Sequence, residues 1–184
     1  NLSFVGPMRL DKGVNFIKSI LKKYDFSKNK VRFNLQVNKL LPFDKNYFRK
    51  LINSKNQKNI NLIQGPLSHK KYLNLIKNSD AIFCPYENKK YFYSTSNIFV
   101  ESLFLNIPII FTKNTWASNF IDKYEKKNLI IGYSLIKNLN DFKKSIIYIK
   151  KNKNKISKDI KIFKKKWSSD NSFKLYFRIL FNSQ

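Results

Sequence analysis

Residues 79–115, SDAIFCPYENKKYFYSTSNIFVESLFLNIPIIFTKNT, decide the fold of this chain. The segment opens with the apolar run AIFC at 81–84 and closes with a run at 107–112 that is rich in β-branched residues, as is typical of strands covered on both faces. Between the runs, residues 94–97 are all good helix N-caps, and apolar residues then recur at helical spacing up to Asn106. The segment therefore predicts a strand, a long polar loop, a helix and a second buried strand, as in a doubly wound α/β domain.

The rest of the chain repeats this alternation. It favours a parallel sheet with right-handed crossovers, here a Rossmann-like doubly wound α/β sheet of about six strands with C-terminal helices. Residues 1–154 are predicted to form this Rossmann-like domain, and residues 155–184 a C-terminal helical extension. The predicted strands lie at 2–6, 31–37, 59–63, 81–84, 107–112 and 129–131; the first predicted helix is capped by Asp11, and the others cover 44–52, 68–78, 94–106, 116–123, 139–166 and 170–182.

The predicted topology also places a ligand site. In the usual strand order 3-2-1-4-5-6, the order reverses between strands one and four, and ligands bind across the loops that follow these two strands. Those loops, 6–13 and 85–96, are polar and contain Gly or Ser. Glu101 lies in the first turns of the helix after the second loop, near a helix end that favours anions. Topology and composition therefore predict one pocket between the two loops.

The composition is strongly basic. The chain of 184 residues has 37 Lys and Arg against 11 Asp and Glu, a formal charge of +26 that would attract any polyanion. However, Lys and Asn fill nearly every predicted exposed position, which is more typical of an AT-rich genome than of one selected patch. A nucleic-acid-binding domain is the least favoured interpretation, because such footprints cluster on one face and no helix-turn-helix, zinc or RNP-type motif is present.

Other features concern the cell compartment. Cys84 is the only cysteine and lies in a predicted buried strand, so no internal disulfide forms and a reducing cytoplasm is predicted. No stretch approaches the roughly 18 consecutive apolar residues of a membrane span.

The Lys-rich helix predicted at 139–166 has an apolar stripe and a basic face. This pattern favours a helix that covers the core, and it also fits an interfacial helix on anionic lipid. If both hold, the protein is peripheral at the inner face of the membrane.

Three stretches are similar to a known family. FVGPMRLDKGVNFI at 4–17 resembles the opening of the C-terminal domain of family 4 GT-B glycosyltransferases, and NINLIQGPLSHKKYLNLIKNSDAIFCPY at 59–86 resembles the strand, helix and strand that follow in that family. SNIFVESLFLNIPIIFT at 96–112 resembles the family's glutamate-containing helix and the next strand. The resemblance implies one half of a GT-B fold, namely the nucleotide-sugar-binding domain of a retaining glycosyltransferase, with a glycan or lipid-linked acceptor as the second substrate.

The resemblance also implies roles for particular residues. In the family, basic residues of the first loop hold the donor diphosphate, a helix N-terminus faces the phosphates, and a glutamate accepts the ribose hydroxyls. Lys12, Arg9 and Glu101 are therefore the implied catalytic residues. The implied donor-binding residues are Gly6, Tyr93, Thr95, Ser96, Asn97 and Glu101.

Two departures from the family pattern bear most directly on function. Tyr93 stands eight positions before Glu101, where the family commonly has a second glutamate, so a non-catalytic nucleotide- or phosphate-binding module is the alternative function. The first predicted strand begins within a few residues of Asn1, so the N-terminal acceptor-binding domain of a GT-B enzyme is expected to be missing. The chain alone is then expected to bind donor without transferring sugar efficiently. Residues 155–184 are expected to pack on the Rossmann-like domain or towards the missing one.

Some side chains allow two interpretations. The aromatic residues of the second loop either stack on a base or sugar or pack against each other. His69 follows a predicted helix cap and is interpreted as a solvated first-turn residue, because no catalytic partner lies near it in sequence. One His, one Cys and no Asp-x-Asp motif predict neither a metal nor a cofactor. The aromatic residues in question are Tyr86, Tyr91, Phe92 and Tyr93.

Overall fold

A computed structural model describes residues 1–37, 50, 57–125 and 129–170 of the chain. Apart from residues 50 and 170, the predicted helices at 44–52 and 170–182 lie outside these residues. Within them, six strands form one parallel sheet in the order β3-β2-β1-β4-β5-β6, which confirms the predicted fold class and the predicted strand order. The strands are β1 (Leu2–Gly6), β2 (Phe33–Val37), β3 (Ile60–Gln64), β4 (Ala81–Cys84), β5 (Ile109–Thr112) and β6 (Gly132–Leu135).

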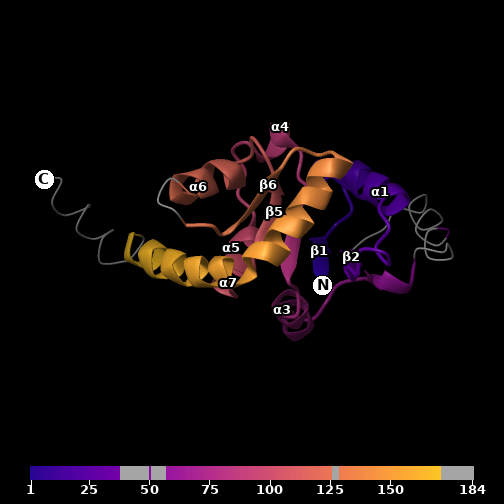
Figure 1. The fold of residues 1–184 in the computed structure, drawn as a ribbon, viewed down its shortest axis with the longest axis horizontal. Coiled ribbons are helices and arrows are strands. Elements are labelled where there is room, and N and C mark those ends of the chain that lie inside the picture. Colours follow the sequence, from indigo (N-terminus) through magenta and orange to yellow (C-terminus); the bar gives the residue numbers. More distant parts are fainter. Residues whose placement is uncertain (38–49, 51–56, 126–128, 171–184) are drawn as a thin grey trace, which may run out of the picture.

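Helices cover both faces of the sheet (Figure 1). On one face, the ring of Phe142 packs 5.1 Å from that of Tyr24 and 5.2 Å from that of Phe83. On the other face, Phe99 packs 6.1 Å from Phe111. The helical segments are η1 (Leu10–Lys12), α1 (Val14–Lys23), η2 (Gln57–Asn59), α3 (His69–Lys77), α4 (Asn88–Tyr91), α5 (Asn97–Phe104), α6 (Trp116–Glu125) and α7 (Leu139–Asp170).

Helix α7 runs diagonally across the molecule (Figure 1). Its first half covers the Phe142 face of the sheet, and its second half reaches α5 and α6, where the ring of Phe163 lies 4.8 Å from that of Tyr124. The helix is continuous from 139 to 170, so the position between 154 and 155, where the sequence suggested a change of domain, falls inside it. Ile149 and Ile156, on either side of that position, are both buried.

The predicted strand at 129–131 is wrong by a few residues, because β6 is Gly132–Leu135. In the sequence, Gly132 looks like a residue that ends a strand. In the structure it lies in β6, where an added Cβ would be only 2.3 Å from the Ile109 carbonyl oxygen. The glycine therefore permits a close approach to β5. Ile130 precedes the strand, and its N–H donates to Asp159 Oδ2 at 2.9 Å.

The predicted cap of the first helix is also wrong. Gly13, with a φ of +80°, occupies the N-cap position of α1, and no side chain caps that helix end. Asp11 lies in η1, where its carboxylate accepts hydrogen bonds from Arg9. The sequence pattern did not distinguish a capping aspartate from one held by a neighbouring arginine.

Candidate functional site at the carboxyl ends of β1 and β4

A pocket of about 540 Å³ lies where the carboxyl ends of β1 and β4 meet the start of α5. This is the reversal point of the strand order, where the sequence predicted a ligand site. Five of the implied site residues line it, namely Gly6, Lys12, Thr95, Ser96 and Asn97.

Gly6 has no side chain, so its main chain itself forms part of the pocket wall. Its φ is +127°, and no heavy atom lies within 4 Å of the place where a Cβ would stand. Its N–H donates to Gln36 Oε1 at 2.9 Å, and Gln36 Nε2 donates to the Gly65 carbonyl at 2.9 Å. Gln36 is only 1% exposed. A ligand can therefore approach the main chain here closely, and a buried amide holds that main chain in place.

The two loops that form the pocket are joined to each other. The Glu87 N–H donates to the Asp11 carbonyl at 2.9 Å, and Lys90 Nζ lies 3.2 Å from Asp11 Oδ2. An added Cβ on Gly13 would lie 1.9 Å from the Pro85 carbonyl oxygen, so only glycine permits this approach. The loop after β1 and the loop after β4 thus form one connected wall.

Lys12 is held over two aromatic rings. Its Nζ lies 3.9 Å from the centroid of the Tyr86 ring and 4.7 Å from that of Tyr91. Burial lowers the pKa of Lys12 from the ordinary lysine value. No carboxylate in the part of the chain that the structure describes forms an ion pair with Lys12. The cation is therefore fixed by its stem and two rings, and it can accept an anionic partner.

The same contacts bear on the aromatic residues of the second loop. Tyr86 and Tyr91 are buried with their ring centroids 4.3 Å apart, and Tyr86 also lines the pocket. Phe92 and Tyr93 are exposed and pack against each other at 4.6 Å. Tyr93 is 85% exposed and does not line the pocket.

Arg9 is placed away from the pocket. Its Nε and Nη2 donate to the two oxygens of Asp11 at 3.0 and 2.8 Å, and its side chain is 52% exposed. Burial alone would raise the pKa of Asp11, but the hydrogen bonds from Arg9 and Lys90 outweigh it and hold that pKa below the ordinary aspartate value. Of the two implied cations, only Lys12 faces the site.

Helix α5 begins at the pocket. Ser96 is its N-cap residue, but the hydroxyl makes no capping bond and lies 3.3 Å from the Tyr86 hydroxyl. Asn97 is the first residue of the helix and is exposed. The first N–H groups of any helix lack an intrahelical acceptor, and the helix dipole favours an anion beside them. The pocket thus combines these features with the cation of Lys12.

Glu101 lies one turn further along α5 and reaches the pocket through another residue. Its Oε2 accepts a hydrogen bond from the hydroxyl of Tyr72 on α3, and Tyr72 lines the pocket. Neither Tyr72 nor Gln36 was given a role in this site from the sequence. A polar amide inside a strand that is otherwise buried was the available signal for Gln36, whereas the helical pattern around Tyr72 held none.

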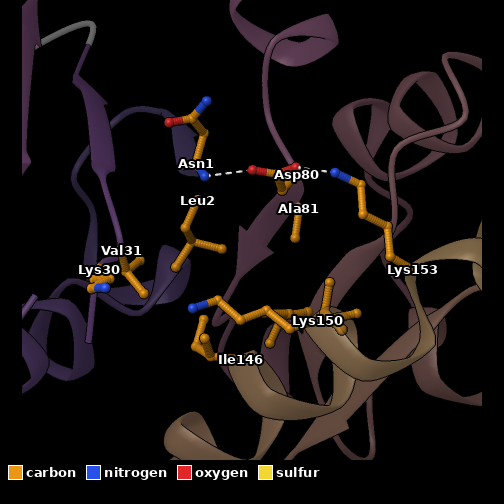
Figure 2. Close-up of a pocket in the computed structure, with 11 residues that line it drawn as sticks. Asn1, Leu2, Lys30, Val31, Asp80, Ala81, Ile146, Lys150 and Lys153 are labelled. Atoms are coloured by element: carbon orange, nitrogen blue, oxygen red, sulfur yellow. Dashed lines mark hydrogen bonds and ion pairs between the residues drawn. The ribbon is translucent and has the colours of Figure 1, made fainter.

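A second pocket, of about 270 Å³, lies beside α7 at the opposite ends of the strands (Figure 2). Its floor is apolar, and Asp80 on its rim is bonded to the Asn1 amino group at 2.6 Å and to Lys153 Nζ at 2.7 Å. It adjoins the amino ends of β1 and β4, and parallel α/β sheets bind ligands beyond the carboxyl ends of their strands. The pocket beside Lys12 is therefore the candidate site.

Two negative findings apply to the described residues. Nowhere among them do three His, Cys, Asp or Glu side chains gather as metal ligands. None of their helices combines the length and the hydrophobicity that crossing a bilayer requires.

Known proteins resemble the chain in structure. No protein-family model and no curated protein sequence matches it. WaaG, a glycosyltransferase involved in lipopolysaccharide biosynthesis, aligns with a TM-score of 0.61 and 13% identity over 94% of this chain and 43% of its own. The catalytic domain of Arabidopsis thaliana starch synthase IV, bound to ADP and acarbose, aligns with a TM-score of 0.67 and 14% identity over 86% of this chain and 33% of its own.

A third structure decides which part of such proteins the chain matches. It is the C-terminal domain of LpcC, a glycosyl transferase group 1 family protein from Francisella tularensis, with a TM-score of 0.60 and 17% identity over 86% of this chain and 80% of its own. The chain has the fold of a GT-B C-terminal domain. The chain spans less than half the length of WaaG and of the starch synthase structure. UDP-N-acetylglucosamine 2-epimerases match as well, so the reaction has to be argued from the site.

Proposed function

We propose that this GT-B domain binds the donor of a retaining glycosyltransferase, which moves a sugar from a nucleoside diphosphate to a glycan or lipid-linked acceptor. One observation carries the proposal: Lys12, the start of α5 and the open backbone of Gly6 line a single pocket. A diphosphate needs a cation, unpaired N–H groups and room to approach the main chain. Glycosyltransferases among the structural neighbours support the same function.

The proposed chemistry is electrostatic. Lys12 and the α5 N-terminus stabilise the negative charge that develops on the leaving diphosphate, and Glu101 accepts the ribose hydroxyls. Arg9 takes part only if it exchanges its two bonds to Asp11 for bonds to phosphate. Retention of the anomeric configuration follows from the resemblance in sequence.

The partners belong to the same proposal. The donor is a nucleotide sugar, and neighbours with the same fold are bound to UDP or ADP. The acceptor binds to a second domain, with the reacting groups in the cleft between the two. No metal or other cofactor is assigned to the reaction. We place the enzyme in the cytoplasm, at the membrane face where cell-envelope glycans are built.

Calorimetric titration with UDP, GDP and ADP at about 0.15 M salt tests the donor site, because this salt screens exposed charges. We expect saturable binding of one nucleotide, weakened about tenfold or more in Lys12→Met, since a charge-assisted hydrogen bond contributes about 1.5–3 kcal/mol. Lys123→Met removes the same charge from an exposed position on α6 and should change the affinity less than about twofold. Equal weak binding of all three nucleotides, with the same loss in both variants, would mean generic attraction to cations.

Tyr93 favours a second candidate, a nucleotide-binding module without transferase activity. The position where the family commonly has a glutamate holds an exposed tyrosine outside the pocket. Both candidates use the same pocket, so the titration supports either. Transfer of labelled sugar by the protein with both GT-B domains would establish the transferase, and tight binding without transfer would establish the module.

A further inference from the structure

Tyr72 connects two elements that are far apart in sequence. It lies on α3, and its hydroxyl donates a hydrogen bond to Glu101 on α5, across 29 positions of the chain. The ring is partly buried and packs against the core, and the side chain also lines the pocket beside Lys12. Glu101 itself is not part of the pocket lining. Tyr72 is therefore the contact that joins this carboxylate to the pocket.

The protonation state of Tyr72 follows from its surroundings. Burial raises the pKa of Tyr72, and the hydrogen bond and charge of Glu101 raise it further. The phenol therefore stays protonated near neutral pH and acts as the donor. No lysine or arginine forms an ion pair with Glu101 in the ranges that the structure describes. In a chain with 37 basic residues, this carboxylate is held by a neutral partner.

A neutral partner leaves the carboxylate of Glu101 able to accept further hydrogen bonds from a ligand. An ionised carboxylate has two oxygens with about four acceptor sites, and the phenol occupies one site on one oxygen. A lysine in the same place would neutralise the charge and compete with a ligand. The phenol fixes the orientation of the carboxylate and leaves the other oxygen for a hydroxyl group.

We propose that Tyr72 is a positioning residue that sets the preference of the site for ribonucleotides over 2′-deoxyribonucleotides. This inference rests on the proposed function, in which Glu101 accepts the ribose hydroxyls. Tyr72 acts through Glu101: the phenol lines the pocket and holds one carboxylate oxygen, and the other oxygen is presented to the vicinal diol of a ribose that reaches past Tyr72 from the pocket beside Lys12. Without the phenol, the carboxylate turns towards water, and the diol loses its acceptor.

The test compares affinities for UDP and 2′-deoxy-UDP, or for the corresponding GDP or ADP pair if the first titration selects that base. We expect the wild-type domain to favour the ribonucleotide about tenfold, the effect of one hydrogen bond to a charged group. Tyr72→Phe keeps the ring and should reduce this ratio to about two or less. The double variant with Glu101→Gln should show no loss beyond that of Glu101→Gln alone, because the two residues act as a unit.

Two controls separate positioning from general damage. Tyr133→Phe removes another hydrogen bond from a tyrosine to a carboxylate, that of Tyr133 to Asp141 at 2.9 Å, outside the pocket, and should leave the ratio unchanged. Lys12→Met should weaken both nucleotides equally, because the diphosphate is the same in both.

The outcomes are distinct. If the wild-type domain binds no nucleotide, the proposed function fails and this inference fails with it. If it binds nucleotides but does not distinguish ribose from deoxyribose, or if Tyr72→Phe keeps the full preference, the inference is overturned while the donor site remains. A ratio that falls in Tyr72→Phe and not in Tyr133→Phe supports the inference.

Discussion

Gly13 and Gly65 share a backbone conformation but not an environment. Their φ angles are +80° and +84°, both in the region that disfavours L side chains. A Cβ on Gly13 would lie 1.9 Å from the Pro85 carbonyl oxygen, whereas a Cβ on Gly65 would meet nothing within 4 Å. Alanine substitutions at the two positions therefore separate the free-energy cost of a positive φ from the cost of steric overlap with a neighbouring loop.

We expect Gly65→Ala to lower the free energy of unfolding by about 1–2 kcal/mol, the cost of a left-handed backbone with a side chain. Gly13→Ala should cost about 1–3 kcal/mol more, because the loop after β1 has to move away from the loop after β4. Urea unfolding measures both values. Equal losses in the two variants would show that the two loops do not depend on this close contact.

The residue scale also shows what the sequence revealed of the candidate site. Gly6, Lys12 and Ser96 were predicted from loop position and resemblance, and the structure brings them together. Their roles in binding stay predictions. Arg9 is held by Asp11, two positions away, and hydrophobic periodicity carries no signal for so local an ion pair. Tyr72 was not recognised because a helical apolar pattern gives the same signal for a core ring and for a ring with a functional hydroxyl.

At the scale of elements, α7 presents an unusual outer face. Ile147 and Ile162 are 52% and 51% exposed. The aspartates Asp141 and Asp159 are bonded to the rest of the domain, through the Tyr133 hydroxyl and the Ile130 N–H. Where side chains are described, the outer face therefore carries cations and two isoleucines without a carboxylate. Its exposed lysines are Lys143, Lys144, Lys151, Lys158, Lys161 and Lys165.

This face predicts binding to anionic lipid. We expect the domain to partition onto anionic vesicles and not onto neutral ones at low salt, because lysines attract the headgroups while isoleucines enter the interface. Replacing Ile147 and Ile162 with Gln should weaken partitioning about tenfold, at about 0.8 kcal/mol per buried methylene and partial insertion. Co-sedimentation with vesicles measures the effect.

Ile136→Gln is the matched control, since Ile136 is 58% exposed but precedes α7. It should leave partitioning unchanged. Equal binding to neutral and anionic vesicles, or an equal effect of all the Gln substitutions, would contradict a specific role for the α7 face.

Element type and order could be read from the sequence more reliably than element boundaries. Strand order followed from the alternation of strands and helices, which leaves few topologies for a parallel sheet. The start of β6 did not, because a strand glycine that packs on a neighbouring carbonyl resembles a terminator unless the neighbour is known. The helix predicted at 139–166 matches α7, which runs to Asp170, but a buried stripe at helical spacing does not show which elements that helix covers.

For the whole molecule, the formal charge of +26 is distributed and not focused. Exposed lysines occur on α1, α3, α6 and α7, that is, on both faces of the sheet. A nucleic-acid-binding protein concentrates its cations on one surface or groove. The described part of the chain is therefore as basic as a polyanion-binding protein, but its cations do not cluster on one surface.

We expect single-stranded DNA and heparin to bind at low salt with similar affinity and without base preference. The affinity should fall steeply and linearly on logarithmic axes between about 50 and 200 mM salt, as counterion release requires. Fluorescence anisotropy with homopolymers of each base measures this. Binding that persists at about 0.2 M salt and depends on the base would revive nucleic-acid recognition as a function.

The connection between the loops after β1 and β4 determines how the site can respond to a ligand. The Asp11 carbonyl and the Glu87 N–H are already bonded, and Gly13 already lies against Pro85. Loops that are ordered in the free protein lose little conformational entropy when a ligand arrives. The wall of the pocket beside Lys12 is therefore already formed when the domain folds. Under the proposed function, adjustment to different nucleotides falls to side chains such as Tyr72, while the course of the backbone stays the same.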